Sequence, residues 1–431
     1  MYLIINRFRD IINRNFEIRG KDMEKRINRS INLYPFYYGF SADLLFYIAI
    51  DTLFLSMVKN FSPSEIVSLT SLSQLLCIAL QFPVLFVIKK IGNTASVRSG
   101  AFLLLLSAIF ITFGKNYFLV LVGRIFHDVA VILRNASVVA LENNLDVVNR
   151  KEDFVTVRTA ANTVYSVITM LISFVASYMF TLNNYLPMIG CITTCAIGFV
   201  ITLFMKDFSP YNKISYKSAP KSKVKIRYSK FIVIAIVSYS VFYTIVTNGQ
   251  NEGKLFIQEQ VLLDFDENGT ALIIGAVVAV SRIIRVLSNL VFAKTYKKYQ
   301  KKMGIILSVF LATSIASLLF GSFIPSVIVK ILVMGFGYSL ILFIRDPFYL
   351  YIQDIVFAVT PREQHQTLLT ILSFGVKLAT AGTGLAFSAI LLGHPMLLVI
   401  AIMLAISIIE ILLSLKLYRV ILTQRKNQIE E

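Results

Sequence analysis

Carboxylates occur inside an apolar segment that is long enough to cross a membrane. Asp43, Tyr47 and Asp51 recur at steps of four within the segment 34–57, so a helix would place them along one side. A charged side chain inside a bilayer is energetically expensive and usually faces a cavity or an ionic partner. We therefore predict that Asp43 and Asp51 exchange protons, with Tyr47 on the same side of the helix. The alternative is that either carboxylate is the structural partner of a neighbouring arginine.

A second charged group lies in the apolar segment 117–141. Arg124 and Asp128 are four residues apart, with His127 beside them, so the first two can pair on one helix face. Histidine changes its charge near neutral pH, and chains of carboxylates and imidazoles relay protons in membrane pumps and transporters. The spacing predicts His127 and Asp128 as proton-carrying groups. A static ion pair that locks neighbouring helices is the alternative.

Two arginines, Arg282 and Arg285, lie one helical turn apart near the middle of the apolar segment 270–293. They would repel each other in a low dielectric unless they face water, acids or an anionic ligand. We predict that they bind an anionic or zwitterionic solute together with Arg124. The competing account is that they pair with Asp43, Asp51 or Asp128.

The composition is that of a membrane protein. Hydrophobic residues make up 56% of the chain and charged residues 15%, against about 45–50% and about 25% in soluble domains. Twelve windows are long enough to cross a membrane, and such uniformly apolar windows must be helices because they lack the alternation of barrel strands. The windows are 34–57, 65–88, 99–113, 117–141, 154–180 and 186–205, then 231–248, 270–293, 303–321, 325–343 continuing toward 354, 367–392 and 396–416.

The windows divide the chain into two six-helix halves joined by a basic linker. We predict a basic N-terminal segment (1–33), a first half (34–205), the linker (206–230), a second half (231–416) and a C-terminal tail (417–431). The predicted fold class is an all-α integral membrane protein whose twelve helices form two pseudo-symmetric halves.

The net charge of +18 follows the predicted topology. Lysine and arginine concentrate in both termini and in the turns on the same side, whereas only Lys59, Lys115 and Lys254 lie in the opposite turns. The positive-inside rule then predicts a multi-pass protein of the cell membrane with both termini in the cytoplasm. The basic excess thus reflects topology and attraction to anionic lipid rather than binding of nucleic acid.

Two apolar helices end on the same kind of short basic turn. The sequence QFPVLFVIKKIG spans 81–92, and NLVFAKTYKKYQ spans 289–300, which is 208 residues later. Charged residues after the segments 117–141 and 325–343 repeat with an offset of 211. We infer an internal duplication, as expected for a transporter built from two repeats.

The first turn resembles the turn between helices 2 and 3 of the major facilitator superfamily, written E-x-P-[ST]-G-x-x-A-D-[RK]-x-G. Pro83, Lys90 and Gly92 match this pattern, whereas Gln81 replaces its acid and Lys89 its aspartate. Taken by topology, the resemblance covers nearly the whole chain and implies alternating access around a central cavity between two six-helix halves. It further implies that helices 1, 4, 7 and 10 line the cavity, which gives Asp43, Tyr47, Asp51, Arg124, Asp128 and Tyr243 as lining residues.

The basic turns also bear on gating. In the family, the aspartate of this turn stabilises the outward-open state by pairing across the two halves, and here Lys89 and Lys297 reverse that charge in both copies. We predict that acidic residues elsewhere close the gate, or that the outward-open state is less stable. The gate candidates are Lys89, Lys90, Gly92, Arg134, Glu142, Lys297, Lys298, Arg345, Asp346 and Asp354.

These features together predict a secondary active transporter. The sequence contains no P-loop, Rossmann glycine run, GxSxG or HExxH motif, so neither an enzyme nor an ATP-driven pump is indicated. We expect a monomer in the lipid bilayer that binds a small-molecule substrate, uses a proton or other ion gradient and needs no cofactor or metal. Import and export both fit. The alternatives are a transporter-like sensor or accessory membrane protein without turnover, and a lipid flippase.

Overall fold

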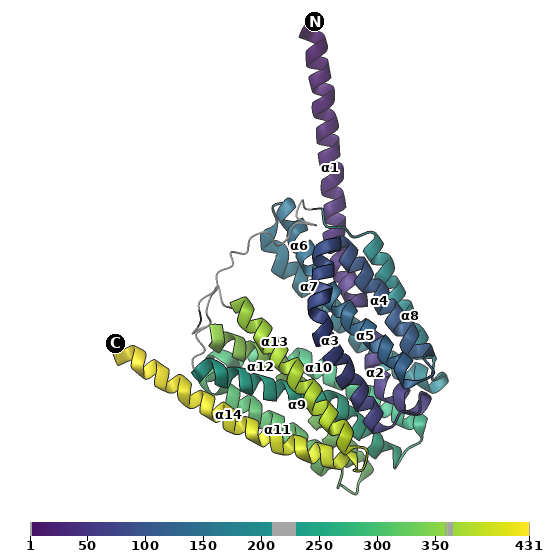
Figure 1. Ribbon diagram of the computed structural model, residues 1–431, viewed down its shortest axis with the longest axis vertical. Coiled ribbons are helices and arrows are strands. Elements are labelled where there is room, and N and C mark those ends of the chain that lie inside the picture. The colour runs from purple at the N-terminus through teal and green to yellow at the C-terminus, as the bar shows by residue number, and fades with distance from the viewer. Residues whose placement is uncertain (1, 209–229, 358–359, 361–364, 431) are drawn as a thin grey trace.

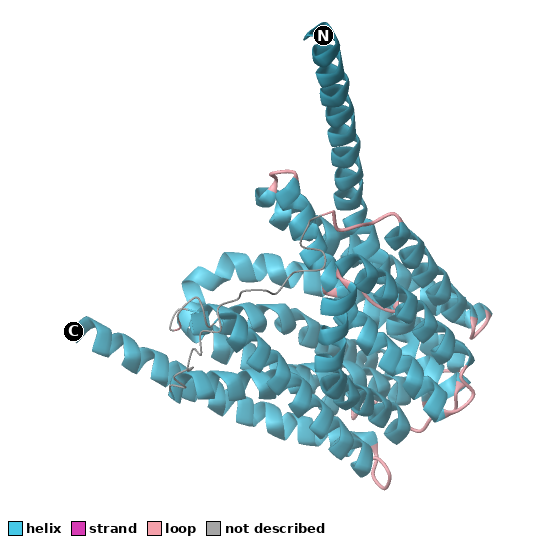
Figure 2. Cartoon of the chain, turned by 45° about the horizontal axis from the view of Figure 1, so that its top comes forward, coloured by secondary structure: helices cyan, strands magenta, loops and turns pink. Residues whose placement is uncertain are grey.

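The computed structural model describes residues 2–208, 230–357, 360 and 365–430 (Figure 1). Within these ranges only the backbone is described at 2–21, 155, 230, 289–290, 293, 297, 301, 365–367, 369–370 and 423–430. Each regular element in the described ranges is a helix, and Figure 2 draws helices and loops there but no strand. The predicted all-α fold class is confirmed.

The first half runs from α1 to α8. It contains α1 (Tyr2–Ser41), α2 (Leu45–Leu53), a π-helical turn (Phe54–Val58), α3 (Pro63–Ile91), α4 (Asn93–Phe113), α5 (Tyr117–Arg134), α6 (Ala136–Val147), a 3₁₀ turn (Lys151–Asp153), α7 (Phe154–Leu182) and α8 (Leu186–Leu203). Helix α1 passes through the boundary predicted between residues 33 and 34 without a break.

The second half runs from α9 to α14. It contains α9 (Lys230–Leu262), α10 (Glu267–Tyr299), a 3₁₀ turn (Gln300–Lys302), α11 (Met303–Gly321), α12 (Val327–Phe357), α13 (His365–Ile390) and α14 (Met396–Glu430). Most of the predicted linker, residues 209–229, lies outside the described residues.

Eleven stretches of the described residues are long and apolar enough to cross a membrane. The remaining crossing is α5, which has 18 residues, the same length as α8. Helix α5 is less apolar because it carries Arg124, Asp128 and Arg134. The described part of the chain therefore contains twelve membrane crossings in two six-helix halves, as the sequence predicts.

Several predicted spans end at different residues in the structure, and two of these differences bear on the site. The span 117–141 is divided at Asn135, whose backbone N–H bonds to the carbonyls of Ile132 and Leu133, so that α6 begins as a separate helix. The span 231–248 was too short, because α9 continues to Leu262. Lys254 consequently lies within a membrane helix and not in a turn, which corrects the prediction.

Local sequence fixes the ends of α3. The Ser62 hydroxyl accepts a hydrogen bond from the Glu65 backbone (3.3 Å), and the Glu65 carboxylate accepts one from the Ser62 backbone (2.8 Å). This reciprocal cap satisfies backbone donors at the helix start. At the other end Gly92 has φ 83°, a backbone conformation that glycine adopts without a side-chain clash. The glycine of the first basic turn is therefore explained by the sharp exit from α3.

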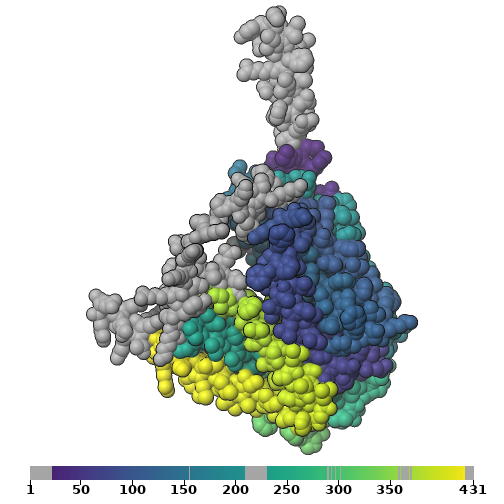
Figure 3. Space-filling view, in the orientation of Figure 1, coloured from purple at the N-terminus to yellow at the C-terminus, as the bar shows by residue number. Residues whose placement is uncertain are grey.

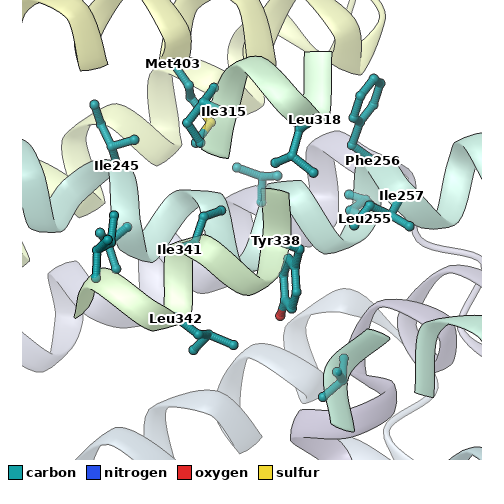
Figure 4. Close-up of a cluster of buried hydrophobic side chains, with 14 of the residues drawn as sticks. Ile245, Leu255, Phe256, Ile257, Ile315, Leu318, Tyr338, Ile341, Leu342 and Met403 are labelled. Carbon is teal, nitrogen blue, oxygen red and sulfur yellow. The ribbon is translucent and has the colours of Figure 1, made fainter. Parts of the chain in front are cut away.

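Aliphatic and aromatic side chains fill the interior of the second half. Figure 4 shows side chains from α9, α11, α12 and α14 converging on one cluster, with the Tyr338 hydroxyl directed away from the aliphatic residues. The labelled members of this cluster are all buried. This packing connects α9, α11, α12 and α14 of the second half through one buried cluster.

The two halves meet on one side of the molecule. We call the far side the one that carries the turns 59–62, 114–116 and 263–266, and the terminal side the one from which the ends of α1 and α14 project (Figure 1). On the far side α3 packs against α13, and α7 packs against α10. Figure 3 shows the dark blue surface of α3 directly against the yellow-green α13. Toward the terminal side the helices of the two halves diverge (Figure 1).

Small residues allow this close approach. A Cβ added at Gly384 on α13 would lie 2.0 Å from the Ser71 hydroxyl on α3, and one added at Gly275 on α10 would lie 2.0 Å from Ser177 on α7. Helix interfaces in membranes use small residues in this way because packing, rather than the hydrophobic effect, drives association there. The far side is therefore a tightly packed contact between the halves.

Candidate functional site

A break between α1 and α2 holds Asp43 and Leu44, where Leu44 has φ −79° and ψ 80°. The break frees backbone carbonyls within the membrane, where an unpaired group costs several kcal/mol. One guanidinium nitrogen of Arg134 donates to the carbonyls of Ser41 (3.3 Å) and Ala42. Arg134, a predicted gate residue, thus stabilises the break inside the first half.

His127 bridges two carboxylates next to this break. Its Nε2 atom lies 2.8 Å from Asp43 Oδ1, and its Nδ1 atom lies 3.2 Å from Asp128 Oδ1. A neutral imidazole has one N–H donor and one acceptor. Both contacts are therefore hydrogen bonds only if the ring carries two protons or if one of the carboxyl groups is protonated. The structure thus brings together three of the four residues predicted to carry protons.

The predicted ion pair between Arg124 and Asp128 is not among the salt bridges of the described residues. The Asp128 Oδ2 atom and the Arg124 Nε atom are each buried without a hydrogen-bond partner. The guanidinium of Arg124 instead lies 5.8 Å from the centre of the Tyr47 ring, within range of a cation–π interaction. A static Arg124–Asp128 lock is therefore not present in this conformation.

Asp51 pairs across the two halves. Its carboxylate accepts a hydrogen bond from Lys254 on α9, and the same ammonium donates to the Ile48 carbonyl at 3.0 Å. The Lys254 side chain is 5% exposed, and buried charges are normally paired. One helical turn further along α9, the Gln258 amide donates to the Ser56 hydroxyl at 2.6 Å. The geometry favours the structural alternative for Asp51, with a lysine in place of the expected arginine.

A cavity of about 330 Å³ lies between the halves. From the first half it is lined by side chains of α1 and α7, and from the second by side chains of α10 and α12. The lining residues are Tyr38, Asn162, Tyr165, Ser166, Thr169, Arg282, Arg285, Val286 and Asp346. Most of them carry hydrogen-bonding groups, so the cavity suits a polar solute.

Arg282 and Arg285 differ in their partners within this cavity. Asp346 accepts two parallel hydrogen bonds from Arg285, at 2.8 and 2.9 Å, the geometry of a strong bidentate pair. Arg282 forms no ion pair with any residue that the structure describes, and its Nε atom is buried without a hydrogen-bond partner. Among the described salt bridges, neither arginine pairs with Asp43, Asp51 or Asp128. That predicted alternative is therefore wrong for this conformation.

Tyr165 lies within electrostatic range of charged residues from both halves. Tyr165 on α7 lies within electrostatic range of Asp43 in the first half and of Arg282 and Arg285 in the second. Charges at this range interact substantially where the surroundings have a low dielectric. Asp43 and the two arginines thus lie within electrostatic range of the same cavity residue, as does Arg134.

Tyr243 lies on α9 near the arginines, but its hydroxyl group bonds to the backbone of α12 and does not line the cavity. Its hydroxyl donates to the Arg345 backbone carbonyl at 2.5 Å, while the Arg345 guanidinium donates to Gln250 Oε1 at 3.1 Å. Neither residue is among those that line the cavity. Tyr243 therefore supports α12 in this conformation.

The sequence and the fold can now be compared with those of known proteins. Residues 36–356 match the family model of the Major Facilitator Superfamily. The chain belongs to the major facilitator superfamily. As a member of this superfamily the protein is a multi-pass membrane transporter of small molecules rather than an enzyme. No curated protein matches the chain.

Solved transporter structures share the fold. The nucleoside transporter NupG has a TM-score of 0.74 at 11% identity, covering 91% of this chain and 99% of that one. A bacterial homologue of the iron transporter ferroportin in the inward-facing state has a TM-score of 0.66 at 13% identity, and the match covers 91% of this chain and 98% of that one. A bacterial homologue of the human lysosomal transporter Spinster, in an inward-facing and unoccupied conformation, has a TM-score of 0.67 at 10% identity. That match covers 92% of this chain and 98% of that one. At these identities the similarity establishes the superfamily fold and nothing about the solute.

Two of the acids predicted to close the gate, Asp346 and Asp354, contact residues of their own half. Asp346 pairs with Arg285, and Asp354 accepts hydrogen bonds from Tyr296 (2.5 Å) and Gln300 (2.7 Å) at the end of α10. Glu142 is exposed on α6. In this conformation the described contacts of these acids do not close the terminal side.

The basic turns lie at the same, terminal side. Lys89 and Lys90 are exposed at the end of α3, and the Lys298 ammonium lies 5.2 Å from the Tyr299 ring centre. The side chain of Lys297 is outside the described residues. The role predicted for these lysines concerns an outward-open state and stays a prediction.

Sequence reasoning missed several side chains that complete the site. Lys254, Tyr38 and Tyr165 were absent from the predicted set, although Lys254 and Gln258 are four apart and share a face of α9. Their spacing was obscured because the polar residues after Asn248 were interpreted as a turn. Tyrosines at a cavity carry no sequence signal that separates them from the other tyrosines of a membrane helix.

Buried acids also lie outside the site, among them Asp207, Glu252 and Glu410. Glu410 on α14 is fully buried and accepts hydrogen bonds from Ser238 (2.6 Å) and Ser414 (3.1 Å). Ser308 on α11 bonds Ser414 at 2.8 Å. These contacts tie α9, α11 and α14 together within the second half.

Proposed function

We propose that this transporter is a secondary active carrier that moves a small anionic solute by alternating access and moves a proton with it. The observation that carries the proposal is the cavity lined by both halves, in which Arg282 has no ionic partner among the described residues. An unpaired guanidinium inside a membrane protein is costly. A bound anion would remove that cost.

The proposed conformation is inward-facing. Packing of the halves on the far side and their divergence toward the terminal side support this, if the termini are cytoplasmic as the basic residues predict. Two of the structural neighbours are inward-facing. The Asp51–Lys254 pair then belongs to the gate that is closed in this state.

The proposed proton site is the group formed by Asp43, His127 and Asp128. With both carboxylates ionised and the imidazole doubly protonated, the group has a net charge of −1. A proton on Asp128 Oδ2, which has no hydrogen-bond partner, brings the net charge to zero. The existing contacts of His127 are retained. Asp128 is therefore the group that we propose takes up the transported proton.

The sign of the coupling follows from the charges. Asp43 lies within electrostatic range of Tyr165, as do Arg282, Arg285 and Arg134, so a negative charge on the group of Asp43, His127 and Asp128 disfavours an anion near Arg282. Protonation removes the repulsion, so proton and anion bind together. Solute and proton should then cross the membrane in the same direction, and an inward proton gradient would drive uptake.

Uptake by purified protein in proteoliposomes tests the proposal. A panel of anionic, zwitterionic, cationic and lipid-like solutes is supplied under an imposed pH gradient, acidic outside. Gradient-stimulated uptake of an anionic solute that is lost in Arg282→Ala supports it. Lys416→Ala removes an exposed charge from α14 and serves as the matched control. Solute-induced thermal stabilisation without any uptake would instead indicate a sensor.

A further inference from the structure

Positive charge exceeds negative charge on the second-half side of the cavity. Arg282, Arg285 and Arg345 lie on α10 and α12, and Arg345 is within electrostatic range of both other arginines and of Asp346. Three guanidinium charges and one carboxylate charge leave a net charge of +2. Like charges at close range repel strongly in a low-dielectric environment.

The only carboxylate among these four residues, that of Asp346, already pairs with one of the arginines. Asp346 holds Arg285 through two hydrogen bonds, at 2.8 and 2.9 Å. Arg345 is bound by Gln250, an uncharged acceptor, at 3.1 Å. Arg282 lines the cavity and has no ionic partner in the described chain. Two of the three positive charges therefore have no carboxylate that neutralises them.

Acids of the first half do not supply the missing negative charge. Asp51 is within electrostatic range of Tyr338, as are Arg282 and Arg345, but the ammonium of Lys254 neutralises Asp51. Asp43 contacts His127. On the first-half side the cavity offers only uncharged hydrogen-bonding groups, from Tyr38, Asn162, Tyr165, Ser166 and Thr169.

We infer that the solute is an organic dianion, with the charge of a phosphate monoester or a dicarboxylate. This rests on the proposed function, which places the solute in this cavity. Arg282 contacts the dianion directly, because a guanidinium presents two parallel N–H donors that fit carboxylate and phosphate oxygens. Arg345 does not line the cavity, but it lies close to the lining arginines and supplies the second positive charge. The cavity volume of about 330 Å³ lies at the small end of the range for ligand sites, which fits a compact solute.

Binding of matched anion pairs to the full-length protein in detergent tests the inference. At pH 8, methyl phosphate is compared with dimethyl phosphate, and succinate with succinamate, by thermal shift titration. Each pair differs by one negative charge at similar size. The dianion of at least one pair should bind on the order of ten-fold more tightly, as expected for one additional charged hydrogen-bonding contact.

Two variants of one arginine separate charge from geometry. Arg282→Gln should lose most of the preference for the dianion, whereas Arg282→Lys should weaken binding of both anions and keep the preference. Lys416→Gln, an exposed change in the same half, should bind as the wild type does. Arg282→Lys keeps the positive charge, so the comparison of the two anions can still be made with this variant if Arg282→Gln does not fold.

Equal affinity within both pairs, or no binding of any of the four anions, would overturn the inference. So would a preference for the dianion that Arg282→Gln leaves unchanged. Failure of the proposed function has a different signature: a dianion that binds through Arg282 but is not taken up by proteoliposomes. Gradient-driven uptake of a monoanion in preference to its dianion would refute the inference and leave proton-coupled anion transport standing.

Discussion

At the scale of single residues, one carboxylate oxygen distinguishes Asp128 from the other acids between the halves. Asp51 is held by Lys254 and Asp346 by Arg285, so protonating either would break an ion pair. Asp128 Oδ2 has no hydrogen-bond partner by distance and angle, and Asp128 forms no ion pair with Arg124, although Ser73 and Arg124 are close enough to interact with its carboxylate. We therefore propose that proton uptake at this atom breaks no ion pair, and that the change of charge affects the cavity through the neighbouring His127 and Asp43.

The variant Asp128→Asn should uncouple transport from the pH gradient. The amide keeps the size of the side chain and mimics its protonated, uncharged state. We expect exchange of solute across the membrane to persist, while stimulation of uptake by an inward proton gradient falls at least ten-fold, in line with loss of an essential proton-transfer group. Radiolabelled uptake with and without the gradient measures this. Undiminished stimulation in Asp128→Asn would exclude this residue as the proton acceptor.

At the scale of the helices, the interrupted first crossing and the continuous α9 position the site. The break between α1 and α2 directs Asp43 toward His127, and Arg134 satisfies the carbonyls that the break exposes. Helix α9 stays helical past residue 248, so that Lys254 and Gln258 reach α2 and the adjoining π-helical turn. The same two features position the proposed proton group and form a contact between the halves on the far side.

Removing one member of the Asp51–Lys254 pair should open the far side. Asp51→Asn leaves a buried ammonium without its counter-ion, which costs on the order of 3 kcal/mol. The double variant Asp51→Asn, Lys254→Met removes both charges and should recover part of that stability. The rate at which an impermeant maleimide labels Ser388→Cys reports opening, because Ser388 is buried against Ser64 on the far side. Equal labelling in the three backgrounds would show that the pair does not hold the gate.

The sequence was sufficient for features that depend on local spacing. Steps of four residues grouped Tyr47 with Asp51 and Arg124 with Asp128, because helical periodicity is a local property. The same spacing wrongly placed Asp43 on one continuous helix with Tyr47, since Asp43 lies in the break before α2. The partners of these residues could not be predicted from spacing. That His127 bridges two acids, and that Asp51 faces a lysine 203 residues away, follows from packing between distant helices. Paired polar residues at the end of α9 resembled a turn because their partners lie in the other half.

At the scale of the whole molecule, the two halves are bodies that meet on the far side. Ser64 and Ser388 exchange hydrogen bonds across that contact, and their hydroxyl oxygens are 3.0 Å apart. Close packing at Gly384 and Gly275 leaves no room for larger side chains there. Alternating access requires these surfaces to separate when the terminal side closes.

A disulfide between Ser64→Cys and Ser388→Cys should therefore abolish transport. The short distance between the two hydroxyls makes a cross-link plausible on geometric grounds. The native Cys77, Cys191 and Cys195 are free and buried, and replacing them with alanine provides the background. We expect oxidation to stop uptake and reduction to restore it, with each single cysteine variant as the control. Full uptake by the cross-linked protein would show that the far side need not open.

Luminal pH during solute entry tests the central claim, that an anion and a proton move together, most directly. Proteoliposomes with equal pH on both sides and a pH-sensitive dye inside receive an external gradient of a transported anion. Co-transport predicts that the lumen acidifies as the anion enters, that Asp128→Asn takes up the anion without acidification, and that Arg282→Ala does neither. Alkalinisation on anion entry, or entry of anion with no change in pH in the wild type, would contradict it.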